Sequence, residues 1–232
     1  MKGVLVNNIE VEIDPRSIQF GGSWQAWTAD GRPAAWDGSI MSFFLEKLQS
    51  IENPVMFDIG ASTGSFCLLP LLHPSTKQVY AFEPVPLIFD ILWSNIQLNK
   101  LQDKVYPHPF ALSNFVGTAM MKIPSDAAMG LACIGKPLRF PTQREVEVSV
   151  KSIDSLNLGK VDIIKIDTEG CELPILRGGE TTIKTHHPMM LIENNPINTQ
   201  QFGYDYRDVR KLLENWGAHY KEVGVEDIFC WW

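Results

Sequence analysis

The sequence predicts an α/β fold in which helices cover both faces of a mainly parallel sheet, giving a three-layer sandwich. Strand-like and helix-like segments alternate from residue 55 onward. Several of the strands are almost unbroken apolar runs, which is typical of strands buried on both faces. A loop with two glycines follows the first of these strands. In a doubly wound sheet, a loop in this position is where a ligand binds.

The core elements follow one another without a linker or an internal repeat. Pro74 limits the first helix, because proline cannot continue a helical ladder. Pro86 suits the first turn of the second helix, and the prolines inside 105–110 suggest an edge strand. The predicted strands are 55–58, 78–82, 105–110, 161–166 and 188–192, and the predicted helices are 65–72, 86–100 and one that begins near residue 172.

The two ends of the chain differ from this pattern. We expect residues 1–50 to form an appendage, with a hairpin around Asn7-Asn8 (strands 4–6 and 10–13), a turn-rich segment and a helix at 39–50. Residues 51–232 are then the main domain. Its last segments, 219–223 and 227–232, read as a hairpin that adds an antiparallel edge to the sheet.

Residues 117–150 interrupt the alternation of strands and helices. Two strands are expected there, at 117–123 and 144–150, around a segment rich in methionine and proline. Long segments of unusual composition are often lids or binding loops. The methionines here, and the tryptophans at 24, 27 and 36, could line an acceptor pocket, but such residues more often pack an accessory layer.

Composition excludes several classes of protein. The chain has 232 residues, 45% of them hydrophobic and 20% charged, which suits a soluble globular protein. No apolar run is long enough to span a membrane, and we expect no secretory signal, because the first residues contain no long apolar stretch. The four cysteines are scattered, so we expect a reducing cytoplasmic location and no zinc site. A net charge of −7 argues against a nucleic-acid partner.

The glycine loop favours S-adenosylmethionine (SAM) over a dinucleotide. Gly60 and Gly64 are present, but Ser62 takes the middle position and no third glycine follows. The loop therefore lacks the glycine that would let the backbone approach a pyrophosphate closely. A compact zwitterion needs only close backbone approach at the two glycines. Asp58 could face its ammonium group, and Glu83 at the end of the next strand could accept hydrogen bonds from both ribose hydroxyls. The alternative interpretation is that the two glycines only form a tight turn and that Glu83 is a solvated residue at a strand end.

A second group of polar residues follows the strand at 161–166. Alternation along an extended chain places Lys165, Asp167 and Glu169 on one side, and Glu193 ends the next strand. Carboxylates this close repel one another unless they bind a cation, contact ligand donors or share a proton. Alternatively, Asp167, Thr168 or Glu169 caps the helix that begins near Glu172. The histidines at 108, 186 and 187 are weaker candidates for a base.

Taken together, these segments resemble the FkbM family of SAM-dependent methyltransferases. The matches lie between residues 50 and 195 in the family's order. They are Asp-Ile-Gly-Ala-Ser-Thr-Gly (58–64), Ala-Phe-Glu-Pro (81–84), Asn-Ile-Gln-Leu-Asn (95–99), Phe-Ala-Leu-Ser (110–113), Ser-Ile-Asp-Ser-Leu (152–156), Lys-Ile-Asp-Thr-Glu-Gly-Cys-Glu (165–172) and Ile-Glu-Asn (192–194).

The resemblance implies a class I methyltransferase fold and O-methylation of a hydroxyl on a small molecule, a sugar or glycan, or a secondary metabolite. It also assigns the residues that hold SAM, whose product is S-adenosylhomocysteine (SAH). Asp58, Gly60, Ala61 and Gly64 would hold the methionine part, Glu83 and Pro84 the ribose, Phe110, Ala111 and Leu112 the adenine, and Asp167 would lie between cofactor and acceptor. The chain departs from the family at Ser62, where asparagine is common.

The expected reaction is an in-line methyl transfer to an aligned oxygen, assisted by a base. Asp167 or Glu193 is the expected base, and Glu169 is the third candidate. A Mg²⁺ ion held by these carboxylates is a variant that we do not expect, because no spacing demands a metal. The alternatives are an N-methyltransferase, a nucleic-acid methyltransferase, a dehydrogenase and a non-catalytic SAM-binding protein. The oligomeric state is not determined by the sequence.

Overall fold

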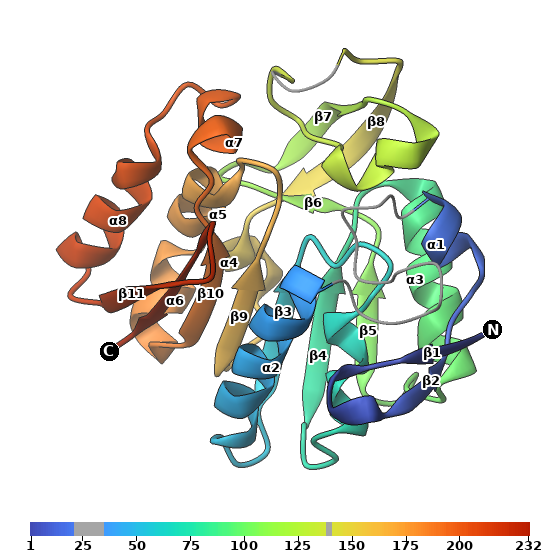
Figure 1. Ribbon diagram of the computed structural model, residues 1–232. Coiled ribbons are helices and arrows are strands. Elements are labelled where there is room, and N and C mark those ends of the chain that lie inside the picture. Colours follow the sequence, from blue (N-terminus) through green and yellow to red (C-terminus); the bar gives the residue numbers. More distant parts are fainter. Residues whose placement is uncertain (21–34, 138–140) are drawn as a thin grey trace.

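The computed structural model describes residues 1–20, 35–137 and 141–232 (Figure 1). These residues form a seven-stranded sheet in the order β11-β12-β10-β9-β3-β4-β5. The five strands from β10 to β5 are parallel, β12 pairs antiparallel with β10, and β11 pairs antiparallel with β12. The strands are β3 (Val55–Ile59), β4 (Gln78–Phe82), β5 (Val105–His108), β9 (Ile163–Ile166), β10 (Met189–Glu193), β11 (His219–Val223) and β12 (Asp227–Trp231). The predicted fold is confirmed.

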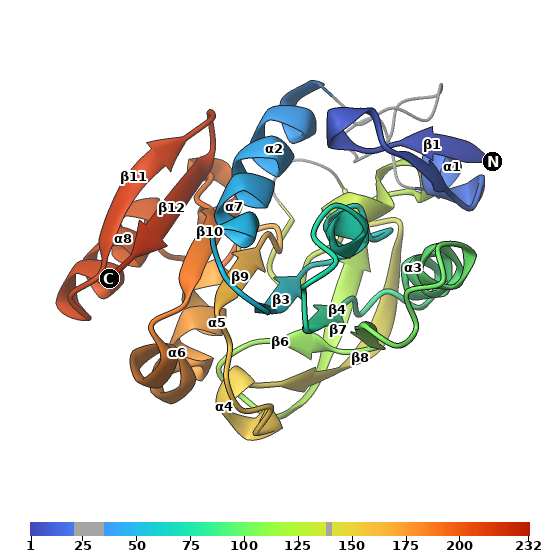
Figure 2. The ribbon, with the colours of Figure 1, turned by 90° about the horizontal axis from the view of Figure 1, so that it is seen from below.

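Side chains that alternate along the strands belong to two separate hydrophobic clusters, one on each face of the sheet. Helices pack on both faces, which gives three layers. Met56 and Ile163 pack with α2 (Ala35–Gln49), η2 (Phe66–Leu71) and α3 (Pro86–Leu98). Their neighbours along the strands, Phe57 and Ile164, pack on the opposite face. The helices there are α4 (Ile153–Leu156), α5 (Glu172–Gly178), α6 (Glu180–His186) and α8 (Tyr206–Asn215). Figure 2 shows α2 on one side of the sheet, and α4 and α6 on the other.

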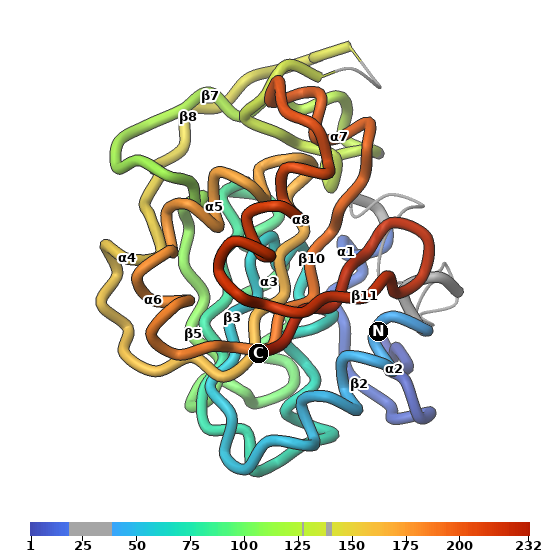
Figure 3. Tube along the Cα trace, turned by 90° about the vertical axis from the view of Figure 1, so that its left-hand side faces the viewer, coloured from blue at the N-terminus to red at the C-terminus, as the bar shows by residue number. Residues whose placement is uncertain are grey.

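A smaller three-stranded sheet lies beyond the carboxyl ends of the main strands, as Figure 1 and Figure 3 show. Its order is β6 (Ala111–Leu112), β8 (Arg144–Lys151), β7 (Gly117–Ile123), and η3 (Asp126–Leu131) follows β7. Both strands expected in residues 117–150 are therefore present. Met121 and Met129 are buried against Ile88 and Ile91 of α3. They pack a layer, as methionines of such segments usually do, although both also line the cavity described below.

Two predicted elements were wrong in type or length. The segment predicted as a helix at 65–72 is the 3₁₀ helix η2, which has Pro70 inside it. Proline has no amide hydrogen, so an α-helical ladder cannot pass through this position. The strand predicted at 105–110 ends at His108, and Ala111–Leu112 pairs with β8 of the other sheet. Pro109 likewise lacks the donor that would extend the β5 ladder.

The N-terminal segment forms the expected hairpin, but its first strand lies at 2–4 instead of 4–6, and the segment then packs onto α3. The hairpin consists of β1 (Lys2–Val4) and β2 (Glu10–Glu12), joined by η1 (Val6–Asn8) and followed by α1 (Arg16–Phe20). Its apolar residues share one hydrophobic cluster with the main sheet. Trp24 and Trp27 lie outside the described residues, as does the side chain of Trp36. Among the described helices, none is both long and apolar enough to cross a membrane.

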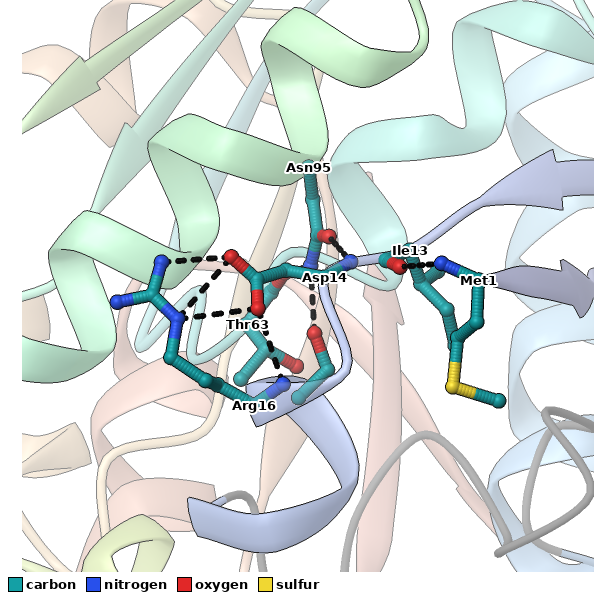
Figure 4. A network of polar contacts seen from close by, with 7 residues as sticks. Met1, Ile13, Asp14, Arg16, Thr63 and Asn95 are labelled. Carbon is teal, nitrogen blue, oxygen red and sulfur yellow. Dashed lines mark hydrogen bonds and ion pairs between the residues drawn. The ribbon is translucent and has the colours of Figure 1, made fainter.

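Asn95 connects this N-terminal segment to the glycine loop (Figure 4). Its side chain is fully buried, and its oxygen accepts a hydrogen bond from the Asp14 amide at 2.7 Å. Its amide nitrogen donates to Ser17 Oγ at 2.9 Å and to the Thr63 carbonyl at 2.7 Å. One turn later, Asn99 exchanges two hydrogen bonds with the backbone of Glu12. Asn95 of α3 and the C-cap residue Asn99 therefore bind the N-terminal backbone, and Asn95 also holds the loop beside it.

Candidate active site

A cavity of about 760 Å³ opens at the carboxyl ends of the parallel strands. The loops after β3, β4, β9 and β10 line it from the sheet side. The small sheet and η3 line a second side, and the 224–227 turn of the terminal hairpin a third. This is the position at which an open α/β sheet binds ligands. The volume is in the range of sites for drug-sized ligands.

Gly60 lets the backbone after β3 turn sharply against the loop that follows β9. Its φ is +77°, and a β-carbon built on it would lie 1.8 Å from the Asp167 carbonyl oxygen. The amides of Gly60 and Ala61 donate to the Phe82 carbonyl at 3.1 and 3.0 Å, which fixes the loop to the end of β4. Only glycine fits such a close approach. The resulting cradle leaves Gly60, Ala61 and Ser62 lining the cavity.

Glu83 is held in the cavity wall by two backbone amides. Its Oε2 accepts from the Ser62 amide at 3.0 Å, and its Oε1 accepts from the Val85 amide at 2.9 Å. The side chain is buried, and burial raises its pKa to about 7 although the two amides oppose this shift. A carboxylate oxygen has a second lone pair, so both oxygens can still accept from a ligand hydroxyl. Pro84 lines the wall beside it.

Asp58 and Gly64 lie behind the cavity wall. Asp58 is fully buried and is not among the lining residues. Its Oδ2 accepts from Cys67 Sγ at 3.1 Å, and its Oδ1 lies 3.7 Å from Lys165 Nζ. A β-carbon on Gly64 would lie 2.6 Å from Leu92 Cδ1 of α3, so this glycine serves packing. Burial raises the pKa of Asp58, while the Lys165 charge opposes that rise.

Lys165 joins the floor of the cavity to the acidic loop. Its ammonium donates to the Gly60 carbonyl at 3.1 Å and lies 3.4 Å from Asp167 Oδ2. It also lies 5.1 Å from the centre of the Phe66 ring. Lys165 thus lies between Asp58 and Asp167, and its expected pairing with a carboxylate is present.

The three candidate bases converge at one end of the cavity. Asp167, Glu169 and Glu193 each offer a carboxylate oxygen, and these atoms lie within 4.8 Å of one another. Glu169 has a φ of +55°, so the chain leaves the extended geometry that the alternation argument assumed. Burial, followed by the charges of Asp167 and Glu169, raises the pKa of Glu193 well above its usual value. Three oxygen ligands of this kind could also hold a hard divalent cation.

The side chain of Asn198 bridges two of these carboxylates. Its fully buried amide nitrogen donates to Glu169 Oε2 at 2.8 Å and to Glu193 Oε1 at 3.0 Å. Asn195 caps the short helix α7 (Pro196–Gln200) and so fixes the backbone that carries Asn198. The sequence interpretation missed Asn198. The signal lay in Asn194-Asn195-Pro196, a helix start directly after the strand that ends in Glu193.

The loop before α5 is held by Glu172, and the capping role considered for its neighbours is not seen in the part of the chain that the structure describes. Glu172 is buried, and its Oε1 accepts from the Thr168 and Gly170 amides at 3.0 and 3.1 Å. The N-cap of α5, Cys171, makes no side-chain cap bond. Asp167 and Glu169 therefore face the cavity while Glu172 holds the loop in place. The remaining expected residues, Phe110, Ala111 and Leu112, line the apolar side of the cavity, whereas His108, His186 and His187 do not.

The parallel sheet with its antiparallel hairpin, and the cavity at its glycine loop, define the class I SAM-dependent methyltransferase fold. The crystal structure of methyltransferase FkbM from Methylobacillus flagellatus has a TM-score of 0.52 and 17% identity to this chain. The match covers 78% of this chain but only 44% of that structure's chain, so this protein spans less than half of it.

Sequence comparison identifies the family. The methyltransferase FkbM domain model matches residues 58–220. Methyltransferase sdnD of Sordaria araneosa is 27% identical over 196 residues, which cover 71% of this chain and 73% of that protein. Hexuronic acid methyltransferase AglP of Haloferax volcanii is 27% identical over 179 residues, covering 75% and 66% respectively. The chain belongs to the FkbM methyltransferase family.

Proposed function

We propose that this protein is a SAM-dependent O-methyltransferase that methylates a hydroxyl of a small molecule, a sugar or a glycan. The observation that carries the proposal is the cavity itself. It joins a backbone cradle, Gly60–Ser62 with Glu83, to a cluster of three carboxylates at its other end. The cradle suits a cofactor, and the cluster suits an acceptor and a base.

The residues of the cradle fit SAM. Glu83 presents two oxygens that can accept from the ribose hydroxyls, and Phe110 to Leu112 offer an apolar surface to the adenine. Gly60, Ala61 and Ser62 line the cavity beside this surface, where the methionine part would lie. When bound, SAM supplies a methyl group that its sulfonium already activates. Asp58 does not line the cavity, so it would not contact SAM directly. It would instead position Lys165 and the glycine loop.

Glu193 is our preferred base. A base works best when its pKa lies near the working pH, and the pKa of Glu193 is raised by burial and by the neighbouring carboxylates. Its Oε2 is buried and has no hydrogen-bond partner among the described residues. Asp167 is the second candidate, but its side chain is 38% exposed and lies 3.4 Å from Lys165 Nζ. Glu169 is the third.

The relatives support an acceptor of this kind. The AglP name states a hexuronic acid as its substrate class, which is a sugar, and sdnD is a fungal methyltransferase. The competing classes are an N-methyltransferase, a nucleic-acid methyltransferase and a non-catalytic SAM-binding protein. The net charge of −7 disfavours a nucleic-acid acceptor, and the complete carboxylate cluster disfavours a purely binding role. Activity in excess chelator would distinguish a base from a Mg²⁺ site at these carboxylates.

Calorimetric titration with SAH and with NAD⁺ tests the cofactor site. We expect micromolar binding of SAH, no binding of NAD⁺, and a loss of at least tenfold in SAH affinity for Glu83→Ala. Glu147→Ala is the matched control, because Glu147 is exposed on β8 and outside the cavity. A preference for NAD⁺ contradicts the proposal, and so does binding of neither ligand.

A further inference from the structure

A second recess in the surface lies between the end of α2 and the terminal hairpin. It is an open groove of about 630 Å³, which we call the hairpin groove. Its described lining residues are three basic side chains, three aromatic side chains, a serine and a methionine, and none of them lines the cavity of the candidate active site. The basic and aromatic residues are Lys47, His187, Lys221, Phe229, Trp231 and Trp232.

The charge of this groove is opposite to that of the whole chain. The net charge of the chain is −7, but none of the described residues that line the groove is acidic. The ammonium groups of Lys47 and Lys221 lie 5.2 and 4.9 Å from the centre of the same Phe43 ring, so the two charges converge. Glu46 lies 2.7 Å from Lys47 Nζ, but its side chain is 69% exposed. Exposed ion pairs contribute little, so the groove retains its attraction for an anion.

The aromatic residues give the groove an apolar wall. Phe229 and Trp231 are two residues apart on β12, so their side chains lie on the same face of the sheet. Their ring centres are 6.0 Å apart, and the rings are inclined by 23°. The Trp232 ring lies 5.0 Å from the ring of His187. Sugar rings pack their C–H faces on aromatic rings, and lysine binds carboxylates through charge-assisted hydrogen bonds. The groove therefore suits a sugar that carries a negative charge.

The hairpin groove and the cavity lie along the same strand and the same helix. Asp227 of β12 lines the cavity, and Phe229 and Trp231 follow it on the same face. Helix α2 lies beside the hairpin (Figure 2), where Phe43 contacts Phe229 with 5.0 Å between ring centres. The first half of α2 contributes to the cavity, and Lys47 near its end contributes to the groove. A sugar chain that follows α2 and β12 can therefore reach both sites.

We infer that the hairpin groove binds a negatively charged sugar unit of the acceptor, and that the acceptor is a glycan chain with acidic groups. The extended strand from residue 227 to residue 231 spans about 13 Å. This separation exceeds the width of one sugar ring, so a monosaccharide cannot occupy both sites. A chain held at both sites gains affinity because its second contact is intramolecular. The inference rests on the proposed function and narrows its acceptor class to acidic glycans.

Calorimetric titration of the full chain in the presence of SAH tests the groove. The ligands are the tetramers of galacturonic acid and mannuronic acid and a tetrasaccharide of hyaluronan. The monomeric uronic acids test the requirement for length, and the fully methyl-esterified galacturonic tetramer is the uncharged match. We expect a uronate tetramer to bind at least about tenfold more tightly than its monomer and than the ester. Equal binding of the ester overturns the inference, and so does the absence of binding by every uronate chain.

Two lysine variants locate the binding site. Lys47→Gln/Lys221→Gln should weaken binding of the tetramer at least about tenfold and leave SAH affinity within about twofold. Lys184→Gln/Lys211→Gln is the matched control, because both of its lysines are exposed and pair with carboxylates outside the groove and the cavity. Trp231→Ala should weaken tetramer binding at least about fivefold. An equal loss in the control variant overturns the assignment to the groove.

Methyl transfer from labelled SAM tests the connection to the acceptor. For a uronate chain that is methylated, the Lys47→Gln/Lys221→Gln variant should raise KM at least about tenfold and leave kcat within about twofold. Binding that depends on the two lysines without methyl transfer to any of the chains overturns this connection. Tighter binding of an oligouridylate than of every uronate chain overturns the ligand class. If SAH does not bind, the proposed function fails, whereas failure of uronate binding alone leaves the cofactor site standing.

Discussion

At the scale of single residues, Glu83 shows how burial and function oppose each other. Its pKa rises from an ordinary value of 4.5 to about 7 because the side chain is buried. The folded protein therefore binds this proton more tightly than the unfolded chain. The associated stability is complete below pH 4.5 and is lost as the pH rises through about 7, a difference of about 3 kcal/mol. Ribose hydroxyls need the ionised form, so ligand binding and unliganded stability favour opposite protonation states.

We expect SAH affinity to increase with pH until Glu83 is fully ionised. Below pH 7, the dissociation constant should increase about tenfold for each unit by which the pH falls. Above about pH 8 it should be constant. Calorimetry at pH 5.5, 6.5, 7.5 and 8.5 measures this dependence. Glu83→Gln should bind weakly with little dependence on pH. A dissociation constant of the intact protein that does not change between pH 5.5 and 8.5 contradicts the assignment.

Asn198 should control the proton affinity of the base. It donates to Glu169 and Glu193 at once, and a donor to the charged form lowers a carboxyl pKa. Asn198→Ala should therefore shift the rising limb of the pH–rate profile to higher pH and lower kcat at neutral pH by about 10-fold to 100-fold. SAH affinity should stay within about threefold of the intact protein. A loss of kcat with an unshifted profile would indicate a purely structural role.

Site residues were predicted best from the sequence where they lie directly at the end of a predicted strand. Glu83, Asp167 and Glu193 each follow or end a parallel strand, and all three line the cavity. Asp58 lies inside β3, in register with Ala81 and Lys165, and so two residues before the level of Glu83 and Asp167; it is buried in the interior. Asn198 lies in the next element, and its contact with Glu169 spans 29 residues. Such a contact has no local signature.

At the scale of elements, the loops after β3 and β9 fit together only because Gly60 has no side chain. We expect Gly60→Ala to destabilise the fold by at least about 3 kcal/mol and to abolish SAH binding, because its β-carbon would overlap the Asp167 carbonyl. Gly159 has the same φ of +77° with nothing within 4 Å of a β-carbon. Gly159→Ala should therefore cost only about 1 kcal/mol. Unfolding in urea measures the stability of the two variants. Equal losses of stability would refute steric contact as the cause.

Helix α3 should hold the N-terminal segment mainly through Asn95. Asn95→Ala leaves the buried Asp14 amide and the Thr63 carbonyl without this partner, so we expect a loss of about 3 kcal/mol. Asn99→Ala removes two hydrogen bonds to Glu12 at a partly exposed site and should cost about 1 kcal/mol. Equilibrium unfolding in urea measures both changes. A larger loss of stability for Asn99→Ala than for Asn95→Ala would show that burial of the hydrogen bonds does not determine their contribution.

Element types were predictable where the pattern is long and regular. The parallel strands and α3 follow from apolar runs and helical spacing; α3 starts at Pro86 as predicted and ends at Leu98 instead of residue 100. The errors fall at 65–72 and 105–110, where prolines limit the backbone hydrogen bonds. Pairing of Ala111–Leu112 with β8 joins segments far apart in the chain, and no local pattern predicts a two-residue strand.

At the scale of the whole molecule, the class of fold follows from the alternation of elements, but the cavity does not. Its walls come from the main sheet, the small sheet, α2 and the terminal hairpin. The sequence indicated that residues 117–150 are an insertion near the site and that the last strands form a hairpin. It did not indicate that the 224–227 turn reaches the carboxylates. That position depends on the register of β12 against β10.

Thermal unfolding tests the expected division into residues 1–50 and 51–232. Leu5, Val11 and Ile13 of the N-terminal segment share one hydrophobic cluster with Met56 and Val79 of the sheet. Asn95 connects the same segment to α3 through a buried hydrogen bond, and Asn99 does so through an exposed one. We therefore propose that the N-terminal segment does not unfold independently. Calorimetry should show a single transition whose calorimetric and van't Hoff enthalpies agree.

Saturation with SAH should move that single transition as a unit. At a concentration 100 times its dissociation constant, a ligand of the folded state adds about 2.7 kcal/mol, which is about 5–10 °C in Tm for a chain of this size. NAD⁺ at the same concentration should leave Tm unchanged. Two resolved transitions, with SAH raising only the upper one, would show instead that residues 1–50 form a separate unit. A single transition that rises with SAH means that the N-terminal segment, α3 and the cofactor loop are one cooperative structure.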